Sequence, residues 1–176
     1  GIAKSAMYKY LVPNFDEKTG KEYYVGGKVP NSDYKNYVPY YISGSATNML
    51  ICFESFIDAL AFLTLQKAKG RAWDSFSWMS FEGVGENEGQ GYSAVPNKLK
   101  NILDARQDIE KIVFAFDNDA AGVNAAASLT KILERVGRYQ CITYLPPKNK
   151  RVGTHGETEF TKDWCDICVE VQFEAR

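Results

Sequence analysis

Acidic side chains follow two strongly apolar runs of this 176-residue chain. Glu54 follows the run 49–53, and Asp117 and Asp119 follow the run 111–116. In a parallel α/β sheet, residues directly after a strand lie at its carboxyl end, where such folds bind their ligands. Crowded carboxylates repel one another, and a divalent cation such as Mg²⁺ removes that repulsion while it binds phosphate oxygens. The spacing therefore predicts a metal-assisted reaction at a phosphate group.

Each of these acids also has a purely structural explanation. Glu54 precedes a predicted helix, where a negative charge is favourable beside the helix dipole. Asp117 or Asp119 could cap the helix that follows them. A single cap does not explain both aspartates, nor does it explain Gly122, whose lack of a side chain allows close approach to that helix. We therefore favour the metal site over capping alone.

Three further acids are candidates for supporting this site. Asp58 is expected in the first turn of the helix after Glu54. Asp163 and Asp166 belong to the segment 162–166, one loop after the last predicted strand. Capping of the final helix and contact with the metal explain these two aspartates equally well, so both roles stay open.

The apolar pattern predicts the elements that must position these acids. Continuous apolar runs are typical of strands buried on both faces, and apolar residues spaced by three and four indicate helices. The predicted strands are 49–53, 75–81, 111–116 and 141–145, and the predicted helices are 56–69, 96–106, 120–136 and 164–173. Because strands and helices alternate, the chain is expected to form an α/β fold, a parallel sheet of about four strands flanked by helices. The segment before the last helix is expected to be a loop.

The first part of the chain has a different composition. Residues 1–48 are rich in Tyr, Lys, Asn, Gly and Pro and show no sustained period, which predicts an irregular β extension. The stretch 16–21 is typical of a hairpin turn, here between expected strands 8–12 and 22–25. The remainder, 49–176, is expected to be the main domain.

Charge and hydropathy limit the classes of function. A net charge of -1 excludes a protein that holds nucleic acid by bulk charge alone. Residues 49–128 carry 7 basic and 11 acidic residues, so the negative charge is concentrated around the predicted metal site, where Mg²⁺ would offset part of it. No uncharged apolar run reaches about 18 residues, which predicts that no segment spans a membrane and that the protein is cytoplasmic.

The acidic motifs resemble those of the Toprim family, the catalytic domain shared by bacterial primases, type IA and type II topoisomerases and some nucleases. The first motif, 51–60, is similar to the apolar strand, glutamate and D-A-L of primase-like members. The second is the DxDxxG pattern of Asp117, Asp119 and Gly122. The third, 162–166, resembles the K-D-W-N-D end of Toprim domains in mobile-element primase and mobilisation proteins.

The resemblance implies a Rossmann-like sheet that binds Mg²⁺, with Mn²⁺ as an alternative, through Asp117, Asp119 and Glu54. It implies that Glu54 is the general acid/base in primase-like nucleotidyl or phosphodiester transfer. The implied contacts to nucleic acid or nucleotides are Lys148, Lys150, Arg151 and Lys162. The expected partners are nucleic acid, above all DNA, nucleotides, and other domains of a longer replication or mobilisation protein.

Departures from the family pattern keep other hypotheses open. Phe56, Ala120 and Cys165 replace residues that are common in the family. One alternative is therefore a Toprim-fold module that binds DNA or docks proteins without catalysis. Another is a phosphatase of the haloacid dehalogenase type, in which an aspartate pair follows the first strand. Here two strands precede Asp117, and Glu54 would have no role.

Overall fold

The computed structural model describes most of the chain. The described residues are 7–9, 12–18, 20–23, 26–33, 36, 41–44, 48–83, 92–152 and 156–174. They include every acid and every cation singled out above.

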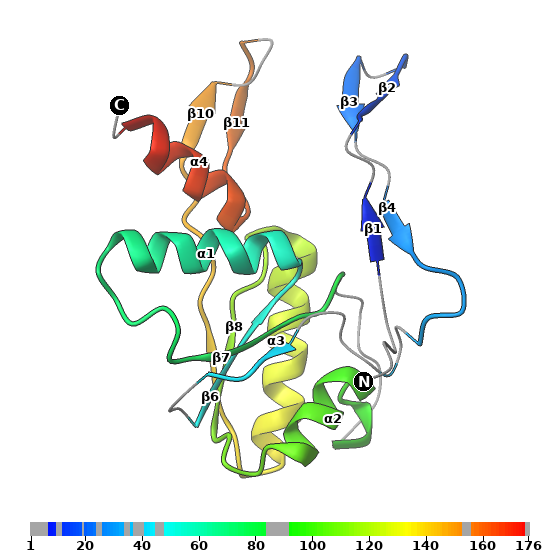
Figure 1. Cartoon of the computed structure of the whole chain (residues 1–176), viewed down its shortest axis with the longest axis vertical. Helices are drawn as coiled ribbons and strands as arrows, with labels where there is room; N and C mark the ends of the chain where they lie inside the picture. The colour runs from blue at the N-terminus through cyan, green and yellow to red at the C-terminus, as the bar shows by residue number, and fades with distance from the viewer. Residues whose placement is uncertain are drawn as a thin grey trace.

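A five-stranded sheet forms the centre of the molecule (Figure 1). In sheet order, its strands are β5 (Tyr41–Ile42), β7 (Ser77–Ser80), β6 (Met49–Phe53), β8 (Lys111–Phe114) and β9 (Gln140–Thr143). The last four run parallel, as predicted. The edge strand β5 pairs antiparallel to β7 and was not predicted. It comes from the segment 1–48, so part of the expected extension pairs with the central sheet.

Helices cover both faces of this sheet. They are α1 (Phe56–Ala68), α2 (Asn97–Ala105), α3 (Ala120–Arg135) and α4 (Trp164–Glu174), with a short 3₁₀ turn η1 (Tyr92–Ala94) before α2. Successive strand residues point to opposite faces, and accordingly Leu50 packs with α2 and α3 whereas Ile51 packs with α1 and α4. All four helices were predicted from the sequence to within a few residues.

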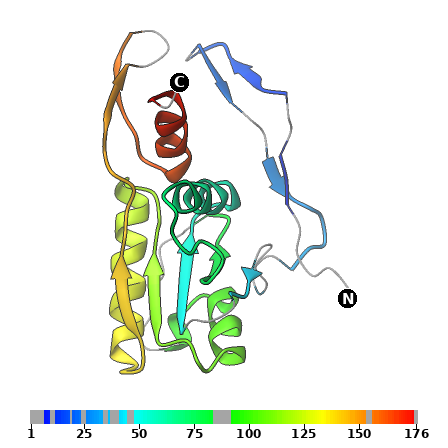
Figure 2. The same ribbon diagram turned by 60° about the vertical axis from the view of Figure 1, so that its left-hand side comes forward.

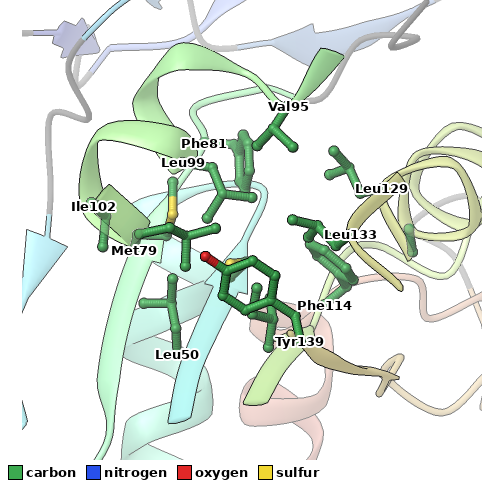
Figure 3. Close-up of a cluster of buried hydrophobic side chains, with 14 of the residues drawn as sticks. Leu50, Met79, Phe81, Val95, Leu99, Ile102, Phe114, Leu129, Leu133 and Tyr139 are labelled. Atoms are coloured by element: carbon green, nitrogen blue, oxygen red, sulfur yellow. The ribbon is translucent and has the colours of Figure 1, made fainter. Parts of the chain in front are cut away.

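The larger core lies between the sheet and helices α2 and α3 (Figure 3). Leu50, Met79 and Phe114 project from the strands and are fully buried. Leu99 from α2 and Leu133 from α3 pack against them from the helical layer. Burying a side chain of this size contributes about 1.5–3 kcal/mol, so this cluster holds the strands whose ends carry the acids.

Among the described residues, three pairs of antiparallel strands accompany the five-stranded sheet. The turn predicted at 16–21 is confirmed, since β2 (Asn14–Asp16) pairs with β3 (Lys21–Tyr23). The expected strand boundaries were wrong, because β1 (Met7–Lys9) pairs instead with β4 (Gly26–Lys28), farther from the turn. Residues 10, 11, 24 and 25 of the expected strands lie outside the described residues.

The third pair of strands, a hairpin, shows that one prediction about the segment before the last helix was wrong. The segment expected to be a loop before the last helix contains β10 (Lys150–Val152) and β11 (Thr158–Phe160), paired antiparallel. These three-residue strands are too short to show an apolar period in the sequence. Figures 1 and 2 show this hairpin beside α4, beyond the end of the sheet. Among the described residues, no helix is long and apolar enough to span a membrane.

The core between α3 and the sheet should dominate stability. Leu133 on α3 is fully buried, and replacing it with alanine should lower the free energy of unfolding by about 2–5 kcal/mol, because a cavity remains. The control Val123→Ala changes a residue of the same helix that is 40% exposed and should cost less than about 1 kcal/mol. Urea denaturation measures both, and equal losses would contradict the described packing.

Candidate functional site

The register of the two central strands brings two of the predicted acids together. Strands β6 and β8 are parallel neighbours, with Cys52 opposite Phe114. Glu54 follows Cys52 by two residues and Asp117 follows Phe114 by three, so both lie at the carboxyl edge of the sheet.

Glu54 turns toward the aspartate loop. The backbone N–H of Asp117 donates a hydrogen bond to Glu54 Oε1 at 3.2 Å. A Cβ atom at Gly122 would lie 2.6 Å from the same Oε1 and 2.3 Å from the carbonyl oxygen of Asp117. Any side chain at position 122 would therefore displace the Glu54 carboxylate or the loop. The close approach predicted at Gly122 is confirmed.

The two aspartates of the loop have different surroundings. Asp119 is the N-cap of α3, and its Oδ1 accepts a hydrogen bond from the N–H of Gly122 at 3.0 Å. Asp117 does not cap the helix. Its Oδ1 is buried and has no hydrogen-bond partner among the residues that the structure describes. Its Oδ2 is 4.0 Å from Nζ of Lys162.

Burial and neighbouring charges favour the protonated carboxyls here. Burial raises the pKa of Asp117 to about 7, and repulsion from Glu54, Asp58 and Asp163 adds to this effect, while Lys162 partly opposes it. The pKa of Glu54 is also raised, mainly by burial and then by Asp119 and Asp58. The hydrogen bond from the Asp117 N–H and the charge of Lys162 partly offset that rise. The site therefore disfavours the simultaneous ionisation of its carboxyls.

The third predicted segment joins the same edge through the backbone. The N–H of Asn118 donates to the carbonyl oxygen of Lys162 at 2.6 Å. Asp163 accepts from the N–H of Asp166 at 2.7 Å, and Asp166 accepts from the N–H of Lys162 at 3.1 Å. Asp163 therefore caps the start of α4, and Asp166 ties the first turn of that helix to the backbone of Lys162. Burial raises the pKa of Asp163, with contributions from Asp166 and Asp58.

Asp58 links helices α1 and α4 beside the site. It lies in the first turn of α1, is only 7% exposed, and accepts from the hydroxyl of Ser55 at 2.5 Å. Its other oxygen accepts from the N–H of Cys165 at 3.4 Å. Trp164 fastens α4 to the sheet as well, since its ring N–H donates to the carbonyl oxygen of Ala115 at 3.0 Å.

The four predicted cations differ in how they are held. Arg151 is paired with Asp166 at 2.6 Å and with Glu159 at 3.3 Å. Lys148 and Lys150 are exposed on and before β10. Lys162 is 55% exposed and, together with Arg151, lines a pocket of about 370 Å³ between the β10–β11 hairpin and the start of α4.

One acid at this edge was missed. Glu82 follows β7, and its Oε1 accepts from the N–H of Phe56 at 2.9 Å and from the hydroxyl of Ser80. The signal was present in the sequence, because Glu82 comes directly after the predicted strand 75–81, as Glu54 comes after 49–53.

The residues present are suited to a hard cation. Carboxylate oxygens are the ligands that Mg²⁺ prefers, and Mg²⁺ usually keeps several waters while it binds one or two carboxylates. The unpartnered Oδ1 of Asp117 offers one such ligand. Within the described ranges, no three His, Cys, Asp or Glu side chains are already grouped to hold a metal. The chemistry of these side chains thus suits Mg²⁺, but the described residues contain no preformed group of three metal ligands.

A family model described as Toprim-like matches residues 51–152, more than half of the chain. The matched region includes Glu54, Asp117 and Asp119 and ends before Lys162. No curated protein matches the chain.

Asp117 should destabilise the metal-free protein as the pH rises. Its folded pKa of about 7 lies above the unfolded value near 4, so ionisation opposes folding progressively between about pH 4 and 7 and fully above that range. With EDTA present, Asp117→Asn should therefore raise stability by about 1–2 kcal/mol at pH 8 and by little at pH 4. Urea denaturation at both pH values measures this. The exposed Asp74→Asn control should show no such pH dependence, and equal behaviour of the two variants would contradict the prediction.

Proposed function

This chain belongs to the Toprim-like family, and from that premise we propose that its sheet-edge carboxylates hold Mg²⁺ in a primase-like domain. Toprim domains generally bind Mg²⁺ and act in nucleic-acid metabolism. Our proposal for this chain is more specific. The domain transfers nucleotidyl or phosphodiester groups, DNA is its nucleic-acid partner, and it works within a replication or mobilisation protein.

The surroundings of Asp117 carry this proposal. A buried carboxylate oxygen without a hydrogen-bond partner is costly, and Glu54 adds a second negative charge beside it. Asp117 caps no helix, because Asp119 caps α3, and its ion pair with Lys162 is long at 4.0 Å and involves only Oδ2. A bound cation explains why this arrangement is retained.

The ligands that we propose for Mg²⁺, or for Mn²⁺ in its place, are Asp117, Asp119 and Glu54, which would have to converge on the ion because the structure does not already group them. When bound, the ion would neutralise charge on the reacting phosphate oxygens. Asp119 contributes from the N-cap position of α3, at the helix end that favours negative charge. Asp58, Asp163 and Asp166 support the site through the helices that they join and cap.

Glu54 is our candidate for the general acid/base. The raised pKa of Glu54 lies nearer to the operating pH, which is the condition under which a carboxyl group can both accept and return a proton. The hydrogen bond from the Asp117 N–H holds Oε1 in place. The opposite carboxyl oxygen, Oε2, is then the atom that we assign to proton transfer with a substrate hydroxyl or a water.

The proposed contacts to nucleic acid or nucleotides lie on the same side. Lys162 is near enough to Asp117 to meet a phosphate at the reacting centre, and the pocket that it lines offers space for one nucleotide unit. Lys148 and Lys150 are exposed for phosphates farther along the strand. Arg151 is already neutralised by Asp166 and Glu159, so we assign it to shaping the pocket wall as well as to binding.

The contact between Glu54 and the aspartate loop disfavours the phosphatase alternative. A haloacid-dehalogenase-type site needs its first aspartate as a nucleophile and has no use for Glu54. Here Glu54 accepts a hydrogen bond from Asp117 itself. The non-catalytic DNA-binding or docking module remains the main alternative, and activity measurements separate it from the enzyme.

Replacing the carboxylates should abolish metal-dependent chemistry. Glu54→Gln should reduce Mg²⁺-dependent primer synthesis or strand cleavage by about 100-fold or more, since general acid/base catalysis contributes at least that much. Asp117→Asn should weaken Mg²⁺ binding in calorimetry, whereas the exposed control Asp74→Asn should change neither property. Equal activity of the wild type and Glu54→Gln would refute the role of Glu54. DNA binding without activity in either protein would support the non-catalytic module.

The exposed lysines should act through phosphate charge. Lys162→Gln and Lys150→Gln should each weaken binding of a fluorescently labelled single-stranded DNA, and each should reduce the slope of log affinity against log salt by about 0.7. Lys131→Gln, an exposed lysine on α3, is the matched control and should leave the slope unchanged. Fluorescence anisotropy across a salt series measures the slopes, and identical slopes for all three variants would argue against this binding surface.

A further inference from the structure

Glu82 has a backbone conformation that its residue type disfavours. Its φ of +52° lies in the left-handed region, where a side chain meets the following carbonyl group. Among the described residues other than glycine, only Asn31 shares a positive φ. Asparagine tolerates this region because its short side chain bonds locally, whereas glutamate does not. Such strain persists when the surrounding structure requires it, often at a functional site.

The strained conformation places the Glu82 carboxylate against the start of α1. Its Oε1 accepts from the N–H of Phe56, the first residue of the helix, at 2.9 Å. That N–H has no acceptor within the helix, and the helix dipole favours a negative charge there. The buried hydroxyl of Ser80 donates to the same oxygen. Glu82 is therefore held by β7 on one side and by α1 on the other.

Glu54 lies inside the segment that this contact fastens. The N–H of Phe81 donates to the carbonyl oxygen of Phe53 at 2.9 Å, and the N–H of Gly83 donates to that of Glu54 at 3.0 Å. With the bond from Phe56 to Glu82, residues 81–83 fasten the backbone immediately before, at and two residues after Glu54. Little freedom remains for the direction in which the Glu54 side chain leaves the backbone.

The Ser55 cap does not account for this contact. Ser55 already caps α1, accepting from the N–H of Asp58 at 3.1 Å. A serine or threonine cap is the usual device for a helix start and imposes no strain on a distant residue. Glu82 instead accepts a hydrogen bond from the N–H of Phe56, which directly follows Glu54 and Ser55.

We propose that Glu82 is a positioning residue that holds Glu54 against the aspartate loop, at the edge where the proposed metal site lies. This inference deepens the proposed function and rests on it for the identity of the metal. Glu82 itself acts through the backbone of residues 54–56 and touches neither metal nor substrate.

The variant Glu82→Gly distinguishes a positioning role of Glu82 from a role in stability alone. Glu82→Gly relieves the backbone strain and removes the carboxylate, so we expect unchanged or higher thermal stability in EDTA together with about 10-fold weaker Mg²⁺ binding by calorimetry. Glu82→Gln keeps an acceptor oxygen and should bind Mg²⁺ within about 3-fold of the wild type. Asn31→Gly, which changes the other residue at positive φ, should leave Mg²⁺ affinity unchanged.

A second readout does not depend on the metal. Amide hydrogen exchange in the metal-free protein reports on the bond from the Asp117 N–H to Glu54, and Glu82→Gly should speed exchange at Asp117 by about 10-fold. Unchanged exchange together with unchanged Mg²⁺ affinity overturns the positioning role. Faster exchange in a protein whose wild type binds no Mg²⁺ would support the positioning role and refute the proposed function, so the two failures are distinguishable.

Discussion

The rest of this structure depends on the placement of two carboxylates, Glu54 and Asp117, at the ends of adjacent central strands. Both are partly withdrawn from water, and burial is the largest cause of the rise in each pKa. A carboxylate in such surroundings favours protonation or a cation, because water no longer solvates its charge fully. The free energy that opposes this placement has to come from packing elsewhere in the domain.

That packing comes from the layers on both sides of the sheet. The buried cluster between the sheet and helices α2 and α3 holds β6 and β8 in register, and the opposite cluster does the same with α1 and α4. The helices also contribute polar contacts at the site itself. Asp119 caps helix α3, and Asp58 joins α1 and α4. The core and the site are therefore stabilised by the same elements.

The absence of a side chain at one position is as important as the charged groups. Gly122 leaves the space in which the Glu54 carboxylate meets the aspartate loop. The opposite case is Glu82, where a side chain is retained despite a backbone conformation suited to glycine. Both residues constrain Glu54, one from the side of α3 and the other from the side of β7. The position of the Glu54 carboxylate is therefore constrained before any ligand binds.

The parallel α/β fold and the positions of the candidate acids after its strands were predictable from the sequence, because both leave local signals. Long apolar runs marked the four parallel strands, and Glu54, Asp117 and Asp119 directly follow them. Gly122 was recognised for the same reason, since its spacing from the aspartates is local.

Short elements left no such signal. Strand β5 has two residues and β10 and β11 have three each, so their pairing depends on partners distant in the chain. Three properties of the site became visible in the tertiary structure. Asp119 and not Asp117 caps α3, and Oδ1 of Asp117 has no hydrogen-bond partner among the described residues. Arg151 is paired with Asp166 and Glu159. Those properties depend on distances and burial between segments, and a hydrogen bond or a desolvated charge exists only once the segments have been brought together.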